Sequence, residues 1–241
     1  MAFPEKGLPT NPTTKPCPQF ALFNTNCEAI PIYCHQWRCD HCRRVLSQRW
    51  AVHAWQSIER WDGSAYFLTL TLWGSITDPK EGYSLIPRYW DNFRKGMQRD
   101  LDDFSYIAFV EGQAKRNGMP HFHIISRDYP YGKRLKDRAV DAGFGYQAKK
   151  ELVVSKGAAA YVSKYVSKGD PNIPKGFRRV RTSRDVGGLP DPPEAPYPLI
   201  PRVGGMDDRD YCESVSKALA IPLATIWELY AAAIDKLSHV G

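Results

Sequence analysis

Two histidines separated by a single residue are the first feature of this sequence that could perform chemistry. They are His121 and His123, in the segment MPHFHII at residues 119–125, whose composition and alternation predict a β-strand. Side chains two residues apart on a strand point to the same face, so both imidazoles project together while Phe122 and Ile124 face a core. Two imidazoles held about 6–7 Å apart by strand geometry can bind one divalent cation. The alternative is an ordinary pair of histidines on a solvated sheet face.

A β-hairpin offers a third ligand for such a site. An Asn-Gly pair at residues 117–118 precedes the histidine strand, and this dipeptide is typical of a tight hairpin turn. A turn centred there places Glu111 opposite His123 and Gln113 opposite His121. A carboxylate beside two imidazoles forms a metal site with open positions for water and substrate. Glu111 is our first choice as the third ligand and Gln113 is the alternative. An exposed cross-strand pair is the interpretation that involves no metal.

A doubled Tyr-Val-Ser-Lys motif carries the candidate nucleophiles. It spans residues 161–168 and follows three consecutive alanines, which predicts a helix over residues 157–168. Residues four apart on a helix stack on one side, so the tyrosines lie together and the lysines lie on an adjacent side. A tyrosine hydroxyl has a pKa near 10, and a neighbouring ammonium favours its nucleophilic form. The motif also fits tyrosines at the edge of a core. The candidate catalytic residues are Tyr161, Lys164, Tyr165 and Lys168.

A cysteine-rich segment predicts a structural zinc site. Five of the six cysteines lie within residues 17–42. The spacing C-x6-C-x4-C-x2-C suits tetrahedral coordination of Zn²⁺ by thiolates, and it is formed by Cys27, Cys34, Cys39 and Cys42. Cys17 is the rival for the fourth position, and His35 and His41 are weaker alternatives. Such a site folds a segment that has too few apolar residues to fold alone. Free buried thiols are the interpretation without metal.

The positive charge of the chain is concentrated in one segment. The 241 residues carry a formal charge of +7, and residues 111–185 hold 17 basic and 7 acidic side chains. Such an excess favours a polyanionic partner, of which nucleic acid is the commonest. The basic run at residues 178–184 is our candidate for contact with the DNA backbone, with a solvated loop as the alternative. Its arginines are Arg178, Arg179, Arg181 and Arg184.

Several classes of protein are disfavoured. No GxxxxGK[ST] motif is present, so we expect no P-loop ATPase or helicase activity. The N-terminus has no basic region followed by an apolar run, so we expect no secretory signal. No stretch approaches the length of a transmembrane helix, so we expect no membrane partner. Clustered cysteines without an export signal favour metal binding in a reducing compartment.

The secondary structure that must position these groups alternates between strands and helices. Apolar periodicity and turn residues predict strands at residues 66–73, 106–113, 119–127 and 144–154. They predict helices at residues 43–61, 87–101 (with Pro87 near the first turn), 133–142, 157–168 and, in one or two pieces, 208–238. This order predicts an α+β fold, with a central antiparallel sheet of about five strands flanked by helices.

We expect four regions along the chain. Residues 1–16 form a flexible arm, and residues 17–61 form the N-terminal zinc knuckle and a helix. Residues 62–185 form the endonuclease core that carries the candidate ligands and nucleophiles. Residues 186–241 form a Pro-rich linker and a helical C-terminal tail.

These motifs, in this order, resemble the HUH endonuclease superfamily, and within it the rolling-circle replication initiator (Rep) proteins of single-stranded DNA phages and related plasmids. The family's strand ending in threonines is matched by FLTLT at residues 67–71. Its His-hydrophobic-His strand is matched at residues 121–123, and its tyrosine followed by lysine at residues 161–168. The cysteine cluster around Trp37 is similar to that of prokaryotic phage-type initiators. The resemblance covers residues 27–185.

The resemblance implies a HUH, ferredoxin-like fold and a nicking mechanism. His121, His123 and Glu111 would hold Mg²⁺ or Mn²⁺, and a tyrosine would attack the scissile phosphate of a single-stranded or hairpin origin. A 5′-phosphotyrosine and a free 3′-OH result, and the 3′-OH primes synthesis. The second tyrosine of the pair would then permit closure of the circle. Lys164 and Lys168 would contact phosphate or stabilise the phenolate. The implied partners are origin DNA and the host helicase and DNA polymerase, in the cytoplasm of a bacterial cell.

Two other functions compete with this interpretation. A single-strand transposase of the same superfamily would use the same chemistry, and inverted ends flanking the gene would identify it. A non-catalytic zinc-ribbon DNA-binding protein would account for the cysteines and the charge. It would leave the ligands and nucleophiles without a joint role, and it would form no covalent adduct with single-stranded DNA.

Overall fold

The structure is a computed structural model, and its described residues fall into two compact units. Met1–Cys42 with Asp191–Gly241 make up the first unit, and Arg43–Pro190 make up the second. The described residues are 17–18, 20–62, 64–113, 116–129, 133–145, 148–154, 168, 172–190 and 198–235. None of the helices within these ranges has the length and apolar character that a membrane span requires.

The first unit joins the two ends of the chain in one small core. Strands β1 (Phe20–Phe23) and β2 (Ala29–Ile32) form an antiparallel hairpin, and α5 (Asp208–Leu219) and α6 (Leu223–Asp235) supply the helices. The core contains Phe23 from the hairpin with Tyr211, Val215 and Tyr230 from the helices. The Tyr211 hydroxyl accepts a hydrogen bond from the Phe23 N–H at 2.8 Å. The C-terminal helices therefore pack with the N-terminal hairpin, whereas the sequence suggested a separate knuckle and tail.

The second unit is built on an antiparallel sheet. Its strands are β3 (Ser64–Thr71), β4 (Tyr106–Gln113), β5 (Met119–Ser126), β6 (Ala148–Val154) and β7 (Val180–Thr182). Among the described residues the sheet has five strands in the order β6-β3-β5-β4-β7. The predicted α+β class and the sheet of about five antiparallel strands are thus confirmed. The histidine strand β5 lies at the centre, between β3 and β4.

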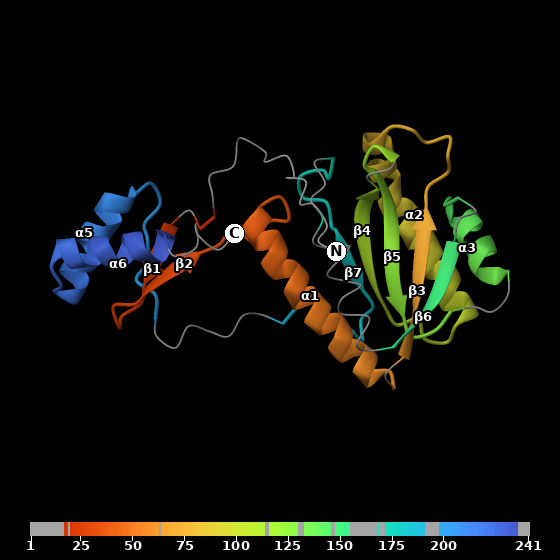
Figure 1. Ribbon diagram of the computed structural model, residues 1–241, viewed down its shortest axis with the longest axis horizontal. Helices are drawn as coiled ribbons and strands as arrows, with labels where there is room; N and C mark the ends of the chain where they lie inside the picture. Colours follow the sequence, from red (N-terminus) through yellow and green to blue (C-terminus); the bar gives the residue numbers. More distant parts are fainter. Residues whose placement is uncertain are drawn as a thin grey trace, which may run out of the picture. The chain divides into compact units, whose positions relative to one another are not determined.

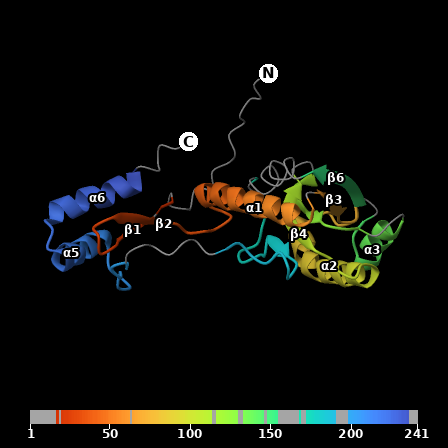
Figure 2. The same ribbon diagram turned by 90° about the horizontal axis from the view of Figure 1, so that it is seen from below.

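Alternation along the strands separates an apolar face from a face that carries the candidate ligands. On one face, Leu68, Val110 and Phe122 pack in a core with α2 (Pro79–Asp100) and α3 (Arg134–Ala142). Figures 1 and 2 show these two helices together on one side of the strands. On the other face, Phe109 contacts Trp50 of α1 (Asp40–Arg60), with ring centroids 6.1 Å apart. The ligands share this second face, because side chains two residues apart on a strand point the same way.

The β4–β5 hairpin closes as expected but in a different register. Asn117 and Gly118 both have positive φ, 52° and 80°, which explains an Asn-Gly pair there. Glu111 lies opposite His121 and not opposite His123, and Gln113 lies opposite Met119. The predicted pairing is therefore wrong by two residues. A slip of two preserves the face of every side chain, so Glu111 still lies on the face of the histidines.

Helix α2 starts earlier than its sequence suggested. Asp78 caps it by accepting a hydrogen bond from the Lys80 N–H at 3.0 Å, and Pro79 stands at the first helical positions. Pro87 is therefore inside the helix and not in its first turn, which corrects the predicted start. Buried Tyr83 and Trp90 continue one apolar face across Pro87, and this packing offsets the lost backbone hydrogen bond.

The remaining expectations fall into two groups. The helices near residues 43–61, 133–142 and 208–238 are confirmed, with the last in two pieces on either side of Pro222. Strands β1, β2 and β7 were not predicted. The predicted arm at residues 1–16 and nearly all of the predicted helix at residues 157–168 lie outside the described residues.

Candidate metal centres

Three side chains converge on the ligand face of the central strands. The Nε2 atoms of His121 and His123 are 2.8 Å apart, and Glu111 Oε2 lies 2.9 Å from His123 Nε2 and 3.8 Å from His121 Nε2. All three residues are buried, with 4–7 % of their surface exposed. Their ligand atoms are mutually close enough to share one cation. The Glu111–His121–His123 group is therefore a candidate metal site, and it is made of the predicted residues.

Strand β3 supports this site with a threonine whose role the sequence did not indicate. Thr69 lies opposite His123, and its Oγ1 is 3.5 Å from His123 Nδ1. A hydrogen bond from Nδ1–H to this oxygen leaves the Nε2 lone pair available for a metal. Alternation of Leu and Thr along β3 signals this face, since Thr69 and Thr71 both pair with histidines across the strand.

Lys168 closes the site from the chain segment that follows the tyrosines in sequence. Its Nζ lies 2.6 Å from Glu111 Oε1, so the carboxylate contacts His123 through one oxygen and Lys168 through the other. Lys168 was predicted to contact phosphate or a phenolate, and its pairing with the ligand carboxylate was not foreseen. The Lys168 side chain is 49 % exposed, so the ammonium lies at the boundary between the buried ligands and solvent.

Burial and neighbouring charges set the protonation states that metal binding needs. Burial opposes ionisation of Glu111, but hydrogen bonds from His123 and Lys168 outweigh it and lower the pKa of the carboxyl. Burial lowers the pKa of His121 to about 4, and burial also lowers the pKa of His123 against the opposing hydrogen bond of Glu111. At neutral pH the site therefore presents an ionised carboxylate and two neutral imidazoles, which is the form that coordinates metal.

A pH dependence of stability follows for the metal-free protein. The pKa of His121 is about 4 when folded against an ordinary 6.5, so between these values the unfolded chain binds the proton and the folded one does not. Stability is thus lost as the pH falls from 6.5 towards 4. Chemical denaturation in a chelator at several pH values measures this, with His121→Gln as the comparison. We expect a shallower decline in the variant, and equal declines would contradict the assignment.

The other predicted site residues are placed less completely. Gln113 lies two positions beyond Glu111 on β4, opposite Met119, and so sits farther along the hairpin than the histidine pair. Its place as an alternative ligand remains a prediction. Tyr161, Lys164 and Tyr165 lie outside the described residues.

A second cluster of ligands lies in the first unit. Cys42 Sγ is 3.6 Å from Cys17 Sγ and 3.5 Å from Cys34 Sγ, and Cys39 completes a group of four. Tetrahedral coordination with Zn–S bonds of about 2.3 Å places sulfur atoms roughly 3.8 Å apart. Burial, together with hydrogen bonds to the neighbouring thiols, raises the pKa of Cys42, as expected for protonated thiols crowded without a cation. This cluster is a candidate metal site whose geometry fits Zn²⁺.

The fourth cysteine is Cys17, which corrects the choice of Cys27. In the β1–β2 hairpin Phe20 pairs with Ile32, so Cys17 and Cys34 flank the open end. Cys27 lies in the turn at the opposite end, where its φ is 62° and its side chain packs against the apolar core. Each strand residue adds about 3.4 Å, so the length of the hairpin separates Cys27 from the other thiols.

The basic run at residues 178–184 divides between the interior and the surface. Arg179 and Arg181 are buried, with 2 % and 8 % of their surface exposed, whereas Arg178 and Arg184 are exposed. Contact with the DNA backbone therefore stays a prediction for Arg178 and Arg184. Buried guanidinium groups cannot reach phosphate without rearrangement, so Arg179 and Arg181 are better explained as internal groups.

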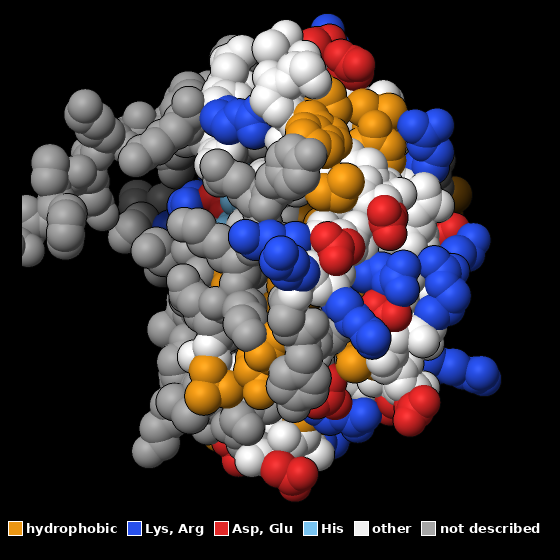
Figure 3. All heavy atoms as spheres, turned by 90° about the vertical axis from the view of Figure 1, so that its right-hand side faces the viewer, with side chains coloured by type: hydrophobic (Ala, Val, Ile, Leu, Met, Phe, Trp, Pro, Cys, Tyr) orange, Lys and Arg blue, Asp and Glu red, His pale blue; other side chains and the backbone are white. Residues whose placement is uncertain are grey.

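Charge on the helical side of the second unit is mixed in sign. Figure 3 shows Lys and Arg side chains interspersed with Asp and Glu on the side that carries α3. Arg138 Nε pairs with Asp100 at 2.7 Å, and Asp91 pairs with Arg94 and Lys95 at 2.8 and 2.6 Å. These ion pairs neutralise part of the excess positive charge counted from the sequence.

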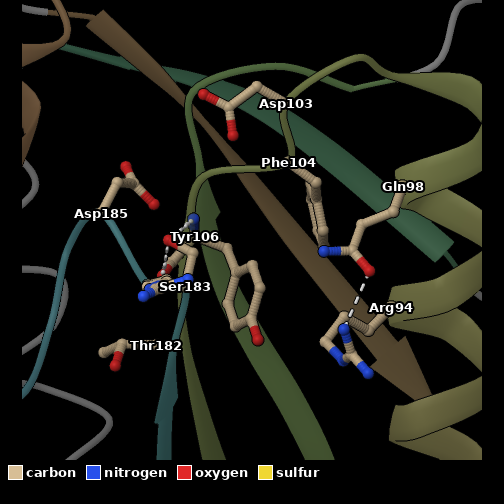
Figure 4. Close-up of a pocket in the computed structure, with 9 residues that line it drawn as sticks. Arg94, Gln98, Asp103, Phe104, Tyr106, Thr182, Ser183 and Asp185 are labelled. Atoms are coloured by element: carbon tan, nitrogen blue, oxygen red, sulfur yellow. Dashed lines mark hydrogen bonds between the residues drawn. The ribbon is translucent and has the colours of Figure 1, made fainter.

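A cavity of about 540 Å³ lies apart from the candidate metal site. It is lined by Arg94 and Gln98 of α2, by Tyr106 at the start of β4 and by residues 182–185 that end β7 and follow it. Figure 4 shows Arg94 hydrogen-bonded to Gln98 beside the Tyr106 ring. Tyr106 belongs to the apolar core with α2, so this cavity opens on the opposite face of the sheet from Glu111.

Comparison with known families agrees with the location of this site. Residues 65–170 match the model of a family of replication-associated proteins, the one described by the name ORF2. The matched segment contains Glu111, His121 and His123 as well as both candidate tyrosines. No curated protein and no solved structure matches the chain. The family match supports a replication-associated protein of the rolling-circle Rep type with a role in initiation.

Proposed function

We propose that this protein is a rolling-circle replication initiator that nicks and rejoins single-stranded DNA through a phosphotyrosine intermediate. The observation that carries the proposal is the convergence of Glu111, His121 and His123 within a segment that matches a replication-associated family. The proposal includes a HUH-type, ferredoxin-like core. A closely related transposase would use the same groups, and the family match favours replication.

The donor set suits the metal that this reaction requires. Imidazoles suit first-row transition metals and a carboxylate suits Mg²⁺ or Mn²⁺, so the mixed group accommodates Mn²⁺ and also Mg²⁺. A divalent ion bound there would supply Lewis-acid polarisation of a phosphodiester oxygen. Glu111 stays ionised for this purpose because His123 and Lys168 hold its pKa down against burial.

The nucleophile is Tyr161 or Tyr165, both within the matched segment. Attack by the tyrosine oxygen forms a bond to phosphorus and breaks the bond to the 3′-oxygen, which leaves as a 3′-OH with the proton of the tyrosine. The phosphotyrosine linkage conserves the bond energy, so the same 3′-OH or a new one can reverse the reaction and join strands. Lys164 and Lys168 would stabilise the phenolate or contact phosphate.

The remaining parts of the proposal concern structure and partners. Zn²⁺ in the Cys17–Cys34–Cys39–Cys42 cluster would hold the first unit's hairpin to the start of α1. Exposed Arg178 and Arg184 would contact the phosphate backbone of origin DNA. Strand separation and synthesis would fall to a host helicase and polymerase in the bacterial cytoplasm.

Substitution of the tyrosines tests the nucleophile. We expect Tyr161→Phe and Tyr165→Phe each to impair nicking or rejoining of a labelled single-stranded origin, and the double variant to lose nicking, because phenylalanine has no oxygen to attack phosphorus. Cleavage is followed on a denaturing gel with Mn²⁺ present. Tyr129→Phe, a tyrosine outside the motif, is the matched control. Wild-type nicking by the double variant would rule out both tyrosines.

A further inference from the structure

A buried arginine joins the two chain segments that meet at the Glu111 carboxylate. Arg179 is 2 % exposed and is among the largest fully buried side chains of the described chain. Its Nε donates a hydrogen bond to the Val110 carbonyl at 3.1 Å, and its Nη2 donates to the Lys168 carbonyl at 2.9 Å. The Val110 N–H in turn donates to the Arg179 carbonyl at 2.9 Å. Strand β4 therefore holds the backbone of Arg179 while its side chain reaches Lys168.

These bonds exploit properties that distinguish arginine from lysine. Burying a guanidinium is unfavourable unless its donors are satisfied, and bonds from a charged donor are stronger than neutral ones. The planar fork of arginine presents several N–H groups in fixed directions, so one side chain can hold two carbonyls at once. A lysine ammonium at the same position is a compact point charge on a flexible stem and does not reproduce this geometry.

The two contacts close a ring of interactions around the candidate metal ligand. Val110 directly precedes Glu111 on β4, and the Lys168 ammonium lies 2.6 Å from Glu111 Oε1. Arg179 thus fixes the Lys168 backbone against the residue before Glu111, and the Lys168 side chain then reaches Glu111 itself. A shift of Lys168 away from β4 would remove its ammonium from the carboxylate.

We propose that Arg179 is a positioning residue that holds Lys168 against β4 and thereby keeps the Lys168 ammonium on Glu111. Its relevance to nicking rests on the proposed function, whereas the contact between Arg179 and Lys168 does not. The role differs from the DNA contact predicted from the sequence, because Arg179 acts from inside the fold.

Arg181 provides a matched control two residues away. It is also buried, at 8 % exposure, but its Nη1 donates to the Arg178 carbonyl at 2.7 Å. Its guanidinium lies 5.4 Å from the Phe122 ring centroid and 5.3 Å from that of Phe177. Loss of either arginine disturbs a buried charge, but the hydrogen bond to the Lys168 carbonyl comes from Arg179.

The reactivity of the Lys168 amine towards an acylating reagent tests the proposal without metal or DNA. Mass spectrometry of peptides from the full-length protein gives the labelling rate at each lysine. We expect Arg179→Lys to raise the Lys168 rate roughly threefold to fivefold, the effect of losing a half-exposed ion pair. Arg179→Gln, which keeps N–H donors but no charge, should act in the same direction. Arg181→Lys should leave the Lys168 rate unchanged, and thermal melting confirms that each variant is folded.

A second background separates positioning from general loosening. Glu111→Gln removes the anion that holds the ammonium, so it should raise the Lys168 rate by itself, and adding Arg179→Lys should then change little. An unchanged Lys168 rate in both Arg179 variants, or a rise that is equal in Arg181→Lys, would overturn the proposal. Nicking assays on the same proteins are independent: wild-type protein that cleaves no DNA contradicts the proposed function, and the labelling result still decides the role of Arg179.

Discussion

Replacement of both His121 and His123 by alanine is expected to abolish metal-dependent nicking. The two Nε2 atoms lie 2.8 Å apart beside the Glu111 carboxylate, so the double variant keeps one of three ligands. Loss of a group that merely orients a ligand typically costs 10–100-fold, and loss of two ligands should cost roughly a hundredfold or more. Initial rates on a labelled single-stranded origin over a range of Mn²⁺ concentrations measure the effect. Added Mn²⁺ should not restore activity, and a chelator should silence the wild type.

A buried histidine outside the site controls for the loss of an imidazole. His53 on α1 is 8 % exposed, and burial lowers its pKa, as it does for the site histidines. It contacts Trp50 and not the ligand group, with ring centroids 5.5 Å apart. His53→Ala should therefore nick at a rate near that of the wild type wherever it remains folded. Nicking by the double variant at the His53→Ala rate would show that the histidine pair is not part of the reaction.

Loss of Cys17 should release the structural metal, whereas loss of Cys27 should not. Cys17, Cys34, Cys39 and Cys42 converge, while Cys27 lies at the far end of the hairpin. Structural zinc contributes roughly 10–16 kcal/mol to the folding of small zinc peptides, so removal of one ligand should unfold the local segment. Native mass spectrometry and zinc analysis give the metal content. We expect one zinc in the wild type and in Cys27→Ser, and none in Cys17→Ser.

The comparison of these two serine variants is sensitive to the ligand assignment. Both remove one half-buried thiol from the same unit, so general destabilisation affects them alike. Zinc retained by Cys17→Ser and lost by Cys27→Ser would restore the ligand set suggested by spacing. Loss in both would mean that the metal depends on the integrity of the hairpin and not on a single thiol.

Local patterns were sufficient to predict the central hairpin and its ligands. The bounds of β4 match the predicted strand, and β5 ends within a residue of it. The register was wrong because the two residues with positive φ, Asn117 and Gly118, lie directly before β5 and not midway between the two strands. Since strand side chains repeat every two residues, Glu111 was still identified as a ligand.

Other features depend on contacts between distant parts of the chain, which local patterns do not contain. Cys17 joins the zinc cluster because residues 20–32 form a hairpin, and the sequence was interpreted there only as cysteine spacing. Arg179 appeared to be one of several surface arginines in a basic run. Its burial depends on the pairing of β4 with β7 and on the return of the chain to Lys168, both of which are tertiary contacts.

The most direct test of the proposed function is identification of the covalent intermediate. The protein is mixed with single-stranded origin DNA and Mn²⁺, digested, and searched by mass spectrometry for a peptide that carries a nucleotide. We expect the nucleotide on Tyr161 or Tyr165, joined through a 5′-phosphate, and absent from the chelator control and from His121→Ala with His123→Ala. Efficient binding without any adduct, or an adduct on a residue outside these two, would contradict the proposed mechanism.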